Sequence, residues 1–298
     1  MRIVTRPDFD GIVCAVLLSE ALEIKEPILW AEPNDVQKGR IDIRKQDIIA
    51  NLPYDQRCAL WFDHHFTNQI DTPFKGVFQI APSAAGIIFE YYKGRFQRDY
   101  SELVQATDKI DSANLTLDEV LHPEKYAYVL LSLTVSNEAH PNEPYWNMLV
   151  DLFRKQDIQQ ILKNSEVKQH CQEVIHQNDR YVDILKQHTV LNRHIALTDF
   201  RSLDRAPFGN RFLVYSLFPE ASVNVRIRPE KHRKDVVVVN VGHSIFNPGC
   251  HVNVGLMLAE FGGGGHRGAG SARVPLSKAD EIISKIVHQL LENKSNED

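Results

Sequence analysis

The sequence contains few residues that could crosslink the chain. Among its 298 residues are four cysteines, which lie far apart and form no Cys-x-x-Cys pair. This spacing argues against a zinc knuckle and against a disulfide framework. Cys14 and Cys58 lie in apolar runs and are expected to be small buried side chains. Reduced thiols suit the cytoplasm, which is the location that we expect.

Long hydrophobic runs and an excess of positive charge are also absent. No run approaches the ~20 apolar residues that span a bilayer, and the N-terminal sequence lacks the apolar core of a signal peptide. We therefore expect a soluble protein with no membrane partner and no targeting segment. The formal net charge of -5 argues against broad nonspecific binding to duplex nucleic acid, although it leaves room for a small basic pocket.

Short apolar runs alternate with helical periodicity in the first half of the sequence. Helices are predicted from Gly11 to Ile24 and from Ser83, as N-cap, to about Lys93. Strands are predicted at residues 2–5, 28–30, 47–51 and 58–62. Strands that alternate with helices are typical of a parallel sheet with helices on both faces.

The second half begins with a mainly helical region. Within it, Ser165 to His188 is charged, amphipathic and free of glycine and proline, which predicts a helix that links two domains. One more surface helix of the first domain is the alternative. The alternation then restarts, with strands predicted at 190–197, 222–227, 235–241 and 271–274 and helices at 252–260 and 277–292. The polar tail from Asn293 is expected to be frayed.

The whole pattern predicts an α/β protein of two domains. Residues 1–185, with a linker helix from about 165, are expected to form a parallel-sheet catalytic domain with a metal site. Residues 186–298 are expected to form a smaller, mixed α/β domain that binds substrate. The active site is expected in the cleft between the two.

Polar side chains cluster where the predicted strands of the first domain end. The first strand ends at Pro7-Asp8-Phe9-Asp10-Gly11, a later one at Asn51, and the next at Asp63-His64-His65. In open parallel sheets, ligands bind beyond the carboxyl ends of the strands. Two carboxylates aimed at one spot repel each other unless a cation lies between them, although a helix N-cap would explain either Asp8 or Asp10 alone. Carboxylate and imidazole together suit Mn, Fe, Co or Zn.

A two-metal centre needs a further carboxylate. The segment from Ala106 to Ser112 offers Asp108 and Asp111 at the end of a helical stretch, and we favour Asp108. A helix C-terminal turn, or the cap of the next helix, is the alternative explanation for either residue.

A glycine-rich segment follows a predicted helix of the second domain. Residues 261–270 carry six glycines, and such a run exposes backbone N–H groups that can bind an anion. Gly264, Gly265, His266 and Arg267 are therefore candidate substrate-binding residues, the last two because they add positive character. A flexible linker is the alternative, which the preceding helix and the following strand argue against.

Together these residues resemble the DHH phosphoesterase superfamily, in the subgroup that carries a DHH-associated C-terminal domain. The Asp-x-Asp turn, the DHH triplet and the GGGGH loop occur in the family order over nearly the whole chain. The resemblance implies that Asp8 binds a first metal ion and that Asp10 and His64 bind a second. It implies that Asp63 binds metal or lies beside its ligands, and that His65 contacts the substrate phosphate.

The resemblance further implies that Asp108 is the distal carboxylate ligand and that the glycine loop holds a non-reacting phosphate of the substrate. At one metal position the chain departs from the family. Where family members place a bridging Asp before the DHH strand, this chain has Asn51, with Asp47 or Asp55 as substitutes if the register differs. A neutral amide bridges two cations less well than a carboxylate does, so we expect Asn51 to be a weak ligand.

A second departure lies just before the Asp-x-Asp turn, where the family normally has a His and this chain has Val4, Thr5 and Arg6. Three outcomes follow: a rebuilt metal cluster, a single-metal enzyme, or an inactive relative. Arg6 at the mouth of the site is a candidate for binding a phosphate through two hydrogen bonds, with a solvated side chain as the alternative.

Other basic residues are left unassigned. His140, His243 and His251 are candidates for a rebuilt cluster, but each is also explained as a surface or hydrogen-bonded histidine. Arg226 and Arg228 lie two apart on a predicted strand, so their side chains point to the same face. That face either lines the substrate-binding site or is exposed to solvent.

The chemistry implied is hydrolysis at phosphorus with two or more divalent ions, with Mn expected and Mg, Co or Zn as alternatives. The expected partner is a short anionic phosphate chain. Because an altered metal site suits a substrate made of phosphates alone, exopolyphosphatase is the first choice. The alternatives are oligoribonuclease (nano-RNase), 3'-phosphoadenosine-phosphate phosphatase, cyclic dinucleotide phosphodiesterase and, from other classes, a non-catalytic DHH scaffold or a metal-dependent sensor. A homodimer is compatible with the sequence.

Overall fold

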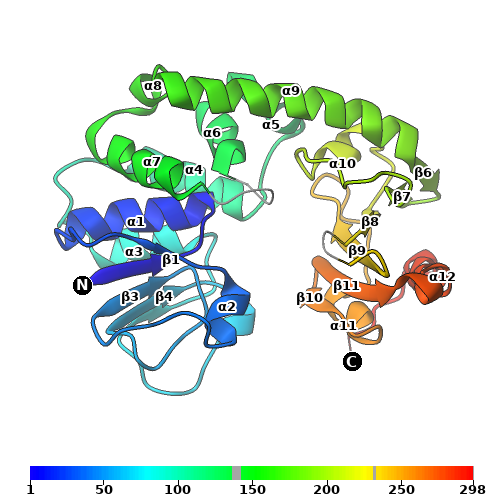
Figure 1. The fold of residues 1–298 in the computed structure, drawn as a ribbon, viewed down its shortest axis with the longest axis horizontal. Coiled ribbons are helices and arrows are strands. Elements are labelled where there is room, and N and C mark those ends of the chain that lie inside the picture. The colour runs from blue at the N-terminus through cyan, green and yellow to red at the C-terminus, as the bar shows by residue number, and fades with distance from the viewer. Residues whose placement is uncertain (136–141, 231–232, 298) are drawn as a thin grey trace. The chain divides into compact units, whose positions relative to one another are not determined.

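Two compact units make up the chain in the computed structural model, which describes residues 1–135, 142–230 and 233–297. The first unit comprises Met1–Leu115 and Pro123–Gln172, and the second comprises Thr116–His122 and Glu173–Asp298. The division falls inside helix α9, Ser165–His188 (Figure 1), so the helix predicted at these residues is present and contributes to both units. In the described part of the chain, no helix has both the length and the apolar composition needed to cross a membrane.

A parallel five-stranded sheet lies at the centre of the first unit, as the alternation of strands and helices predicts. Its order is β2 (Leu29–Trp30), β1 (Arg2–Thr5), β3 (Asp47–Ala50), β4 (Leu60–Asp63) and β5 (Gly76–Phe78). The sequence does not predict β5, because three residues are too few to show a period. All neighbouring strands are parallel, so the residues that follow β1, β3 and β4 meet at one edge of the sheet.

Two capping side chains begin the helices that matter most for the site. The side chain of Asp8 accepts a hydrogen bond from Gly11 N at the start of α1, and Ser83 accepts one from Gly86 N at the start of α3, as predicted for Ser83. The helices of the first unit are α1 (Phe9–Ala21), α2 (Pro33–Gln37), α3 (Ala84–Tyr91), α4 (Ser101–Asp111), α6 (Ala127–Val135), α7 (Glu143–Lys155) and α8 (Ile158–Ile161).

Alternate residues of the strands pack against different layers. Val4, Ile49 and Trp61 join one buried cluster that includes α2 and its neighbouring loops. Phe62, the next residue along β4, packs edge-on against Tyr91 of α3 with ring centroids 5.1 Å apart. Both faces of the sheet are therefore buried, as is usual for parallel sheets, and this leaves the carboxyl edge as the place where polar side chains can gather.

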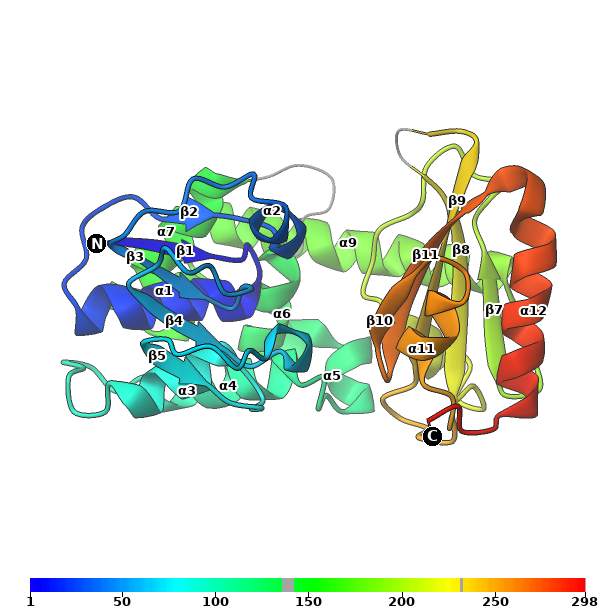
Figure 2. The ribbon, with the colours of Figure 1, turned by 90° about the horizontal axis from the view of Figure 1, so that it is seen from below.

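A mixed six-stranded sheet forms the core of the second unit. Its order is β10 (Gly264–His266), β11 (Ala269–Pro275), β9 (Val236–His243), β8 (Val223–Pro229), β7 (Ile195–Asp199) and β6 (Thr189–Asn192), with β7 and β8 parallel and the other neighbours antiparallel. Helices α11 (Val254–Ala259) and α12 (Ala279–Glu292) pack with Val225, Val239 and Val274 of the sheet (Figure 2). Two short helices, α5 (Leu117–Leu121) and α10 (Leu213–Leu217), also belong to this unit.

One strand prediction for the second unit was wrong. The continuous strand predicted at 190–197 is a hairpin of β6 and β7, because the chain turns at Arg193, which has a left-handed φ of 54°. The glycine run is not a free loop throughout, since part of it forms β10 and pairs with β11. A Cβ on Gly255 of α11 would lie 2.5 Å from the carbonyl oxygen of Gly265, so glycine at 255 lets α11 pack directly against this strand.

The C-terminal tail is not frayed at the residues that follow α12. Asn293 adopts a left-handed conformation, and its side chain accepts a hydrogen bond of 2.8 Å from His251 N. The Asn296 side chain accepts one of 2.7 Å from Asn253 N. The prediction of fraying was wrong because these asparagine side chains satisfy backbone groups near the start of α11.

A largely buried ion pair joins β1 to β3 at the amino end of both strands. Nη2 and Nε of Arg2 lie 2.6 and 3.1 Å from the two carboxylate oxygens of Asp47. Asp47 is 1% exposed and also accepts a hydrogen bond from Arg44 N. Because Asp47 begins β3, it lies at the opposite end of the strand from Asn51 and does not replace it.

Removing the Asp47 carboxylate should destabilise the first unit strongly. Asp47→Ala leaves the mostly buried Arg2 guanidinium without its partner, and the expected loss in free energy of unfolding is about 3 kcal/mol. Asp35→Ala, which breaks the exposed pair with Arg40, is the matched control and should cost less than about 1 kcal/mol. Urea unfolding followed by circular dichroism measures both, and equal losses would contradict the role given to Asp47.

Candidate metal centre

The carboxyl edge of the parallel sheet gathers the polar residues that the sequence places at strand ends. In the register of the sheet, Thr5 of β1 pairs with Ala50 of β3, and Ala50 pairs with Phe62 of β4. The segments that follow these residues therefore emerge side by side. They carry the candidate site residues Arg6, Asp8, Asp10, Asn51, Asp63, His64 and His65.

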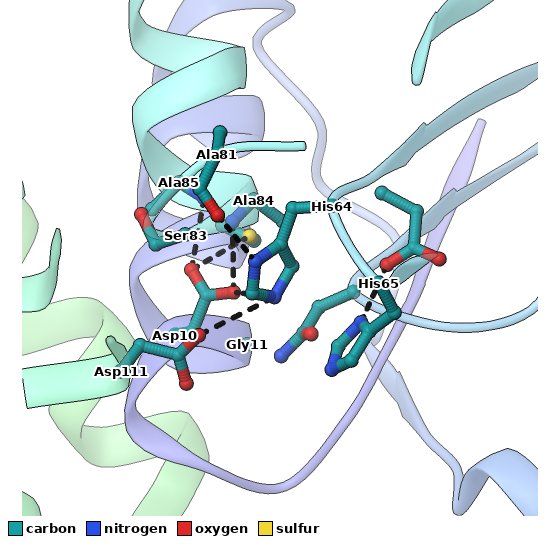
Figure 3. A network of polar contacts seen from close by, with 12 residues as sticks. Asp10, Gly11, His64, His65, Ala81, Ser83, Ala84, Ala85 and Asp111 are labelled. Atoms are coloured by element: carbon teal, nitrogen blue, oxygen red, sulfur yellow. Dashed lines mark hydrogen bonds and ion pairs between the residues drawn. The ribbon is translucent and has the colours of Figure 1, made fainter. Parts of the chain in front are cut away.

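Asp10 connects α1 to α3 through its buried carboxylate. Its two oxygens accept hydrogen bonds from Ala84 N (3.0 Å) and Ala85 N (2.8 Å) in the first turn of α3 (Figure 3). Burial raises the pKa of Asp10, as does the nearby charge of Asp8, while the two backbone N–H groups offset part of the rise. A carboxylate in this position is held firmly by the protein and gains from a cation beside it.

His64 presents one ring nitrogen to two carboxylates. Its Nδ1 lies 3.0 Å from the carbonyl oxygen of Ala81, which can only accept, so the proton of the neutral ring lies on Nδ1. Its Nε2 lies 3.8 Å from Asp10 Oδ2 and 3.3 Å from Asp111 Oδ2 (Figure 3). Within the residues that the structure describes, this buried Nε2 has no hydrogen-bond partner. A lone pair facing two carboxylates is repelled by them unless a proton or a metal ion lies between, and a ring fixed by a backbone carbonyl is typical of metal ligands.

The C-terminus of α4 supplies the distal carboxylate, and the residue beside His64 is Asp111. Burial and then the charges of Asp10 and Asp8 raise the pKa of Asp111. Asp108, which the sequence-based prediction preferred, instead accepts a hydrogen bond of 2.6 Å from Ser83 Oγ. The distances therefore reverse that preference, because Asp108 faces the start of α3 one helical turn before the end of α4.

Both carboxylate oxygens of Asp63 are hydrogen-bonded to neighbouring side chains, one of them His65. Its Oδ1 lies 2.8 Å from His65 Nδ1, and its Oδ2 accepts a hydrogen bond of 2.7 Å from the Asn68 side chain. Burial lowers the pKa of His65, but the hydrogen bond and charge of Asp63 outweigh it, so the net pKa is above its ordinary value. Asp63 therefore orients His65 and favours its protonated form.

Two groups of described residues bring potential ligand atoms within 4.8 Å of one another. One is Asp63, His64 and His65, and the other is Asp10, His64 and Asp111. The second group fits a divalent ion better, because its His64 Nε2 has no hydrogen-bond partner among the described residues, whereas in the first group Asp63 and His65 Nδ1 are hydrogen-bonded to each other. Two anionic oxygens and one imidazole nitrogen are donors that Mn, Fe, Co and Zn accept.

Asp8 belongs to neither group, because donors surround its carboxylate. Its Oδ1 accepts hydrogen bonds from Gly11 N (2.8 Å) and from the Asn51 side chain (2.9 Å). Its Oδ2 lies 3.2 Å from Arg6 Nε. Asp55, considered as a substitute for Asn51, is bonded to Arg57 in the following loop. The residues predicted to bind a first metal ion therefore bind one another.

The predicted substrate residues of the glycine segment belong to the second unit. Gly264, Gly265 and His266 form β10, and Arg267 Nε lies 3.1 Å from both carboxylate oxygens of Glu297 in the C-terminal tail.

The other basic candidates that the structure describes belong to the second unit. His243 Nε2 lies 3.0 Å from the carbonyl oxygen of Val252, and burial lowers the pKa of His243. Arg228 Nε donates to Asn240 Oδ1, and Arg226 lies on the same strand, β8. The backbone of His251 is bonded to the C-terminal tail, and His140 lies outside the described residues.

Several residues that shape the site were missed by sequence reasoning. Asn68 holds Asp63, the carbonyl of Ala81 holds His64, and the amides of Ala84 and Ala85 hold Asp10. Only Asn68, five residues after Asp63, left a polar signal in the sequence. The backbone groups leave none, because every residue has them.

This arrangement defines a class of protein. A largely buried imidazole and two carboxylates at the carboxyl edge of a parallel sheet could hold a divalent cation, beside a histidine whose pKa is raised. Such a centre is suited to hydrolysis of phosphate esters, where a cation and a proton donor stabilise charge on the phosphoryl oxygens.

Comparison with solved structures identifies the family. The chain is 31% identical to the pGpG-specific phosphodiesterase PggH from Vibrio cholerae, with 98% of this chain and 99% of that chain covered and a TM-score of 0.82. The fold is also shared with an exopolyphosphatase-related protein from Bacteroides fragilis at 10% identity, with 97% and 91% covered and a TM-score of 0.53. The chain belongs to the DHH superfamily of metal-dependent phosphoesterases.

Another solved structure that shares the fold has metal bound. The RecJ structure from Thermus thermophilus, in complex with Mn2+, is 11% identical, with 98% of this chain and 52% of that chain covered and a TM-score of 0.60. No protein-family model matches the chain, and no curated protein matches it in sequence.

Asp111→Asn should stabilise the metal-free protein and weaken metal binding. In the absence of metal, the Asp10 and Asp111 charges repel, and their raised pKa values mean that ionising them toward neutral pH costs stability. Removing one charge should therefore raise the free energy of unfolding at neutral pH by about 1 kcal/mol. Loss of a ligand should weaken Mn2+ binding by more than about 100-fold, since even supporting residues matter by about 10- to 100-fold.

Asp108→Asn is the control, because this carboxylate contacts Ser83 and not His64. Thermal unfolding with and without Mn2+, together with calorimetric titration, separates the two variants. Equal loss of Mn2+ affinity in both, or an effect confined to Asp108→Asn, would contradict the assignment of Asp111.

Proposed function

We propose that the protein hydrolyses short linear ribonucleotides of the pGpG class to mononucleotides. The observation that carries this proposal is the 31% identity, over 98% of the chain, with a phosphodiesterase described as pGpG-specific. This substrate lies between the oligoribonuclease and cyclic dinucleotide alternatives considered from the sequence. Inorganic polyphosphate, the first choice from the sequence, has less support as the substrate. The exopolyphosphatase-related structure is only 10% identical and supports the fold alone.

Three side chains of the first unit are proposed to bind the metal ion. Asp10 and Asp111 supply anionic oxygens, and His64 supplies Nε2. A divalent ion, for which we propose Mn2+ ahead of Mg2+, Co2+ or Zn2+, lowers the pKa of a water molecule and neutralises charge on the attacked phosphoryl group. The two carboxylate charges balance the two positive charges of the ion.

His65 is proposed to contact the phosphoryl oxygens of the substrate. Its Nδ1 is bonded to Asp63, so Nε2 is the ring atom that we assign to the substrate. The charge of Asp63 favours a protonated ring, and a protonated ring donates a charge-assisted hydrogen bond to a phosphoryl oxygen. Hydrolysis breaks the bond between phosphorus and the bridging oxygen, water supplies the new oxygen on phosphorus, and the leaving oxygen takes a proton.

A substrate panel tests the proposal directly. Purified protein with Mn2+ would be given pGpG, cyclic di-GMP, a five-nucleotide RNA, 3'-phosphoadenosine-phosphate and long-chain polyphosphate, with products separated by ion-exchange chromatography. The expected result is conversion of pGpG to GMP with kcat/KM at least about tenfold above every other substrate, a difference of about 1.4 kcal/mol. Phosphate release from polyphosphate without cleavage of pGpG would overturn the proposal.

Substitutions at His65 and Asp63 should separate catalysis from metal binding. His65→Gln removes the proposed phosphate contact and should lower kcat by about 100- to 10,000-fold, the range for a group that transfers or shares a proton. Asp63→Asn leaves the ring but loses its charged partner, and a smaller loss is expected. Because neither change removes a proposed metal ligand, Mn2+ affinity measured by calorimetry should stay within a few-fold of wild type. Full activity of His65→Gln would rule out its role.

A further inference from the structure

One carboxylate at the site is neutralised by the chain itself. Asp8 accepts hydrogen bonds from Gly11 N and from the Asn51 side chain on Oδ1, and its Oδ2 lies 3.2 Å from Arg6 Nε. Two neutral donors and one guanidinium thus surround this carboxylate. A metal ion that used Asp8 as a ligand would have to displace Arg6 and lie beside its permanent positive charge.

Asn51 contacts the same carboxylate through its side-chain nitrogen, while its side-chain oxygen is buried without a hydrogen-bond partner among the described residues. It is 1% exposed and adopts a left-handed φ of 55°, which places its amide beside β1. Because its nitrogen donates to Asp8, the positive end of the amide dipole points at the carboxylate. An aspartate at 51 would repel Asp8 and call for a cation between them, whereas asparagine binds Asp8 without one.

The remaining part of the site keeps the character of a cation site. Asp10 and Asp111 carry negative charge near His64 Nε2, which has no hydrogen-bond partner among the described residues. No arginine or lysine pairs with either carboxylate among the ion pairs of the described residues. The two halves of the site therefore differ in charge: the Asp8 carboxylate is paired with Arg6, whereas Asp10 and Asp111 have no arginine or lysine partner among the described residues.

We propose that this chain binds one metal ion, at Asp10, His64 and Asp111, and that Arg6, paired with Asp8, replaces a second ion. The two or more ions expected from the family resemblance do not fit the contacts of Asp8. The Arg6 side chain is 40% exposed, so its guanidinium stays accessible while it is paired. Arg6 directly follows β1 at the carboxyl edge of the sheet, the same edge at which His65, the proposed phosphate contact, follows β4. This inference rests on the proposed function for the identity of that phosphate.

Metal stoichiometry tests the inference without reference to activity. Equilibrium dialysis against Mn2+ followed by elemental analysis should find one ion per chain in the wild-type protein. The double variant Arg6→Ala, Asn51→Asp removes the guanidinium and restores a carboxylate next to Asp8, and it should bind two ions. Electron paramagnetic resonance should show an isolated Mn2+ in the wild type and an exchange-coupled pair in the double variant.

Arg57→Ala is the matched control, since it removes an arginine that is paired with an aspartate in the loop after Asn51. It should still bind one ion. Two ions in the wild type would overturn the inference whether or not the variants fold. One ion in a double variant whose circular dichroism matches the wild type would overturn the role of Arg6 and Asn51.

The experiments distinguish failure of the single-ion inference from failure of the proposed function. Cleavage of pGpG by a wild-type protein that holds two ions would overturn this inference and leave the proposed function in place. One bound ion without cleavage of pGpG would overturn the proposed function and support the single-ion site.

Discussion

The buried carboxylate of Asp10 is the group on which the site depends. It lies in the first turn of α1 and accepts hydrogen bonds from Ala84 N and Ala85 N at the start of α3. These amides offset part of the cost of burying its charge. The chain that leads into α3 also carries the carbonyl of Ala81, which fixes the ring of His64. One polar contact between two helices thus places a carboxylate and an imidazole of the same metal site.

Charge balance explains why neighbouring carboxylates have different roles. Asp8 is paired with Arg6, and Asp63 is hydrogen-bonded to His65 and Asn68, so both are stabilised by the chain itself. Asp10 and Asp111 repel each other, and burial raises the pKa of both. The folded chain is therefore prepared for a cation at one position, and binding there relieves the repulsion.

Sequence patterns predicted the parallel sheet, the cap at Ser83, the helix Ser165–His188 and the gathering of polar residues at strand ends. They did not identify which of two nearby acidic residues contacts His64. Asp108 and Asp111 are both acidic and three apart on α4, and only the direction of the helix against α3 decides which one reaches His64. Short elements were also missed, because β5 and the turn at Arg193 are set by neighbouring strands rather than by a local period.

The sequence by itself determined the chemical inventory and its order along the chain: an Asp-x-Asp turn, a DHH triplet after an apolar strand, and Asn51 in place of a carboxylate. Short apolar runs in alternation with helical segments were enough to place these residues at one edge of a sheet, because that edge follows from parallel pairing. Only the tertiary structure decided which side chains meet a cation and which are paired internally. Those roles depend on contacts of a few ångströms between segments distant in sequence, such as Arg6 with Asp8 beside Asn51, or His64 with Asp111.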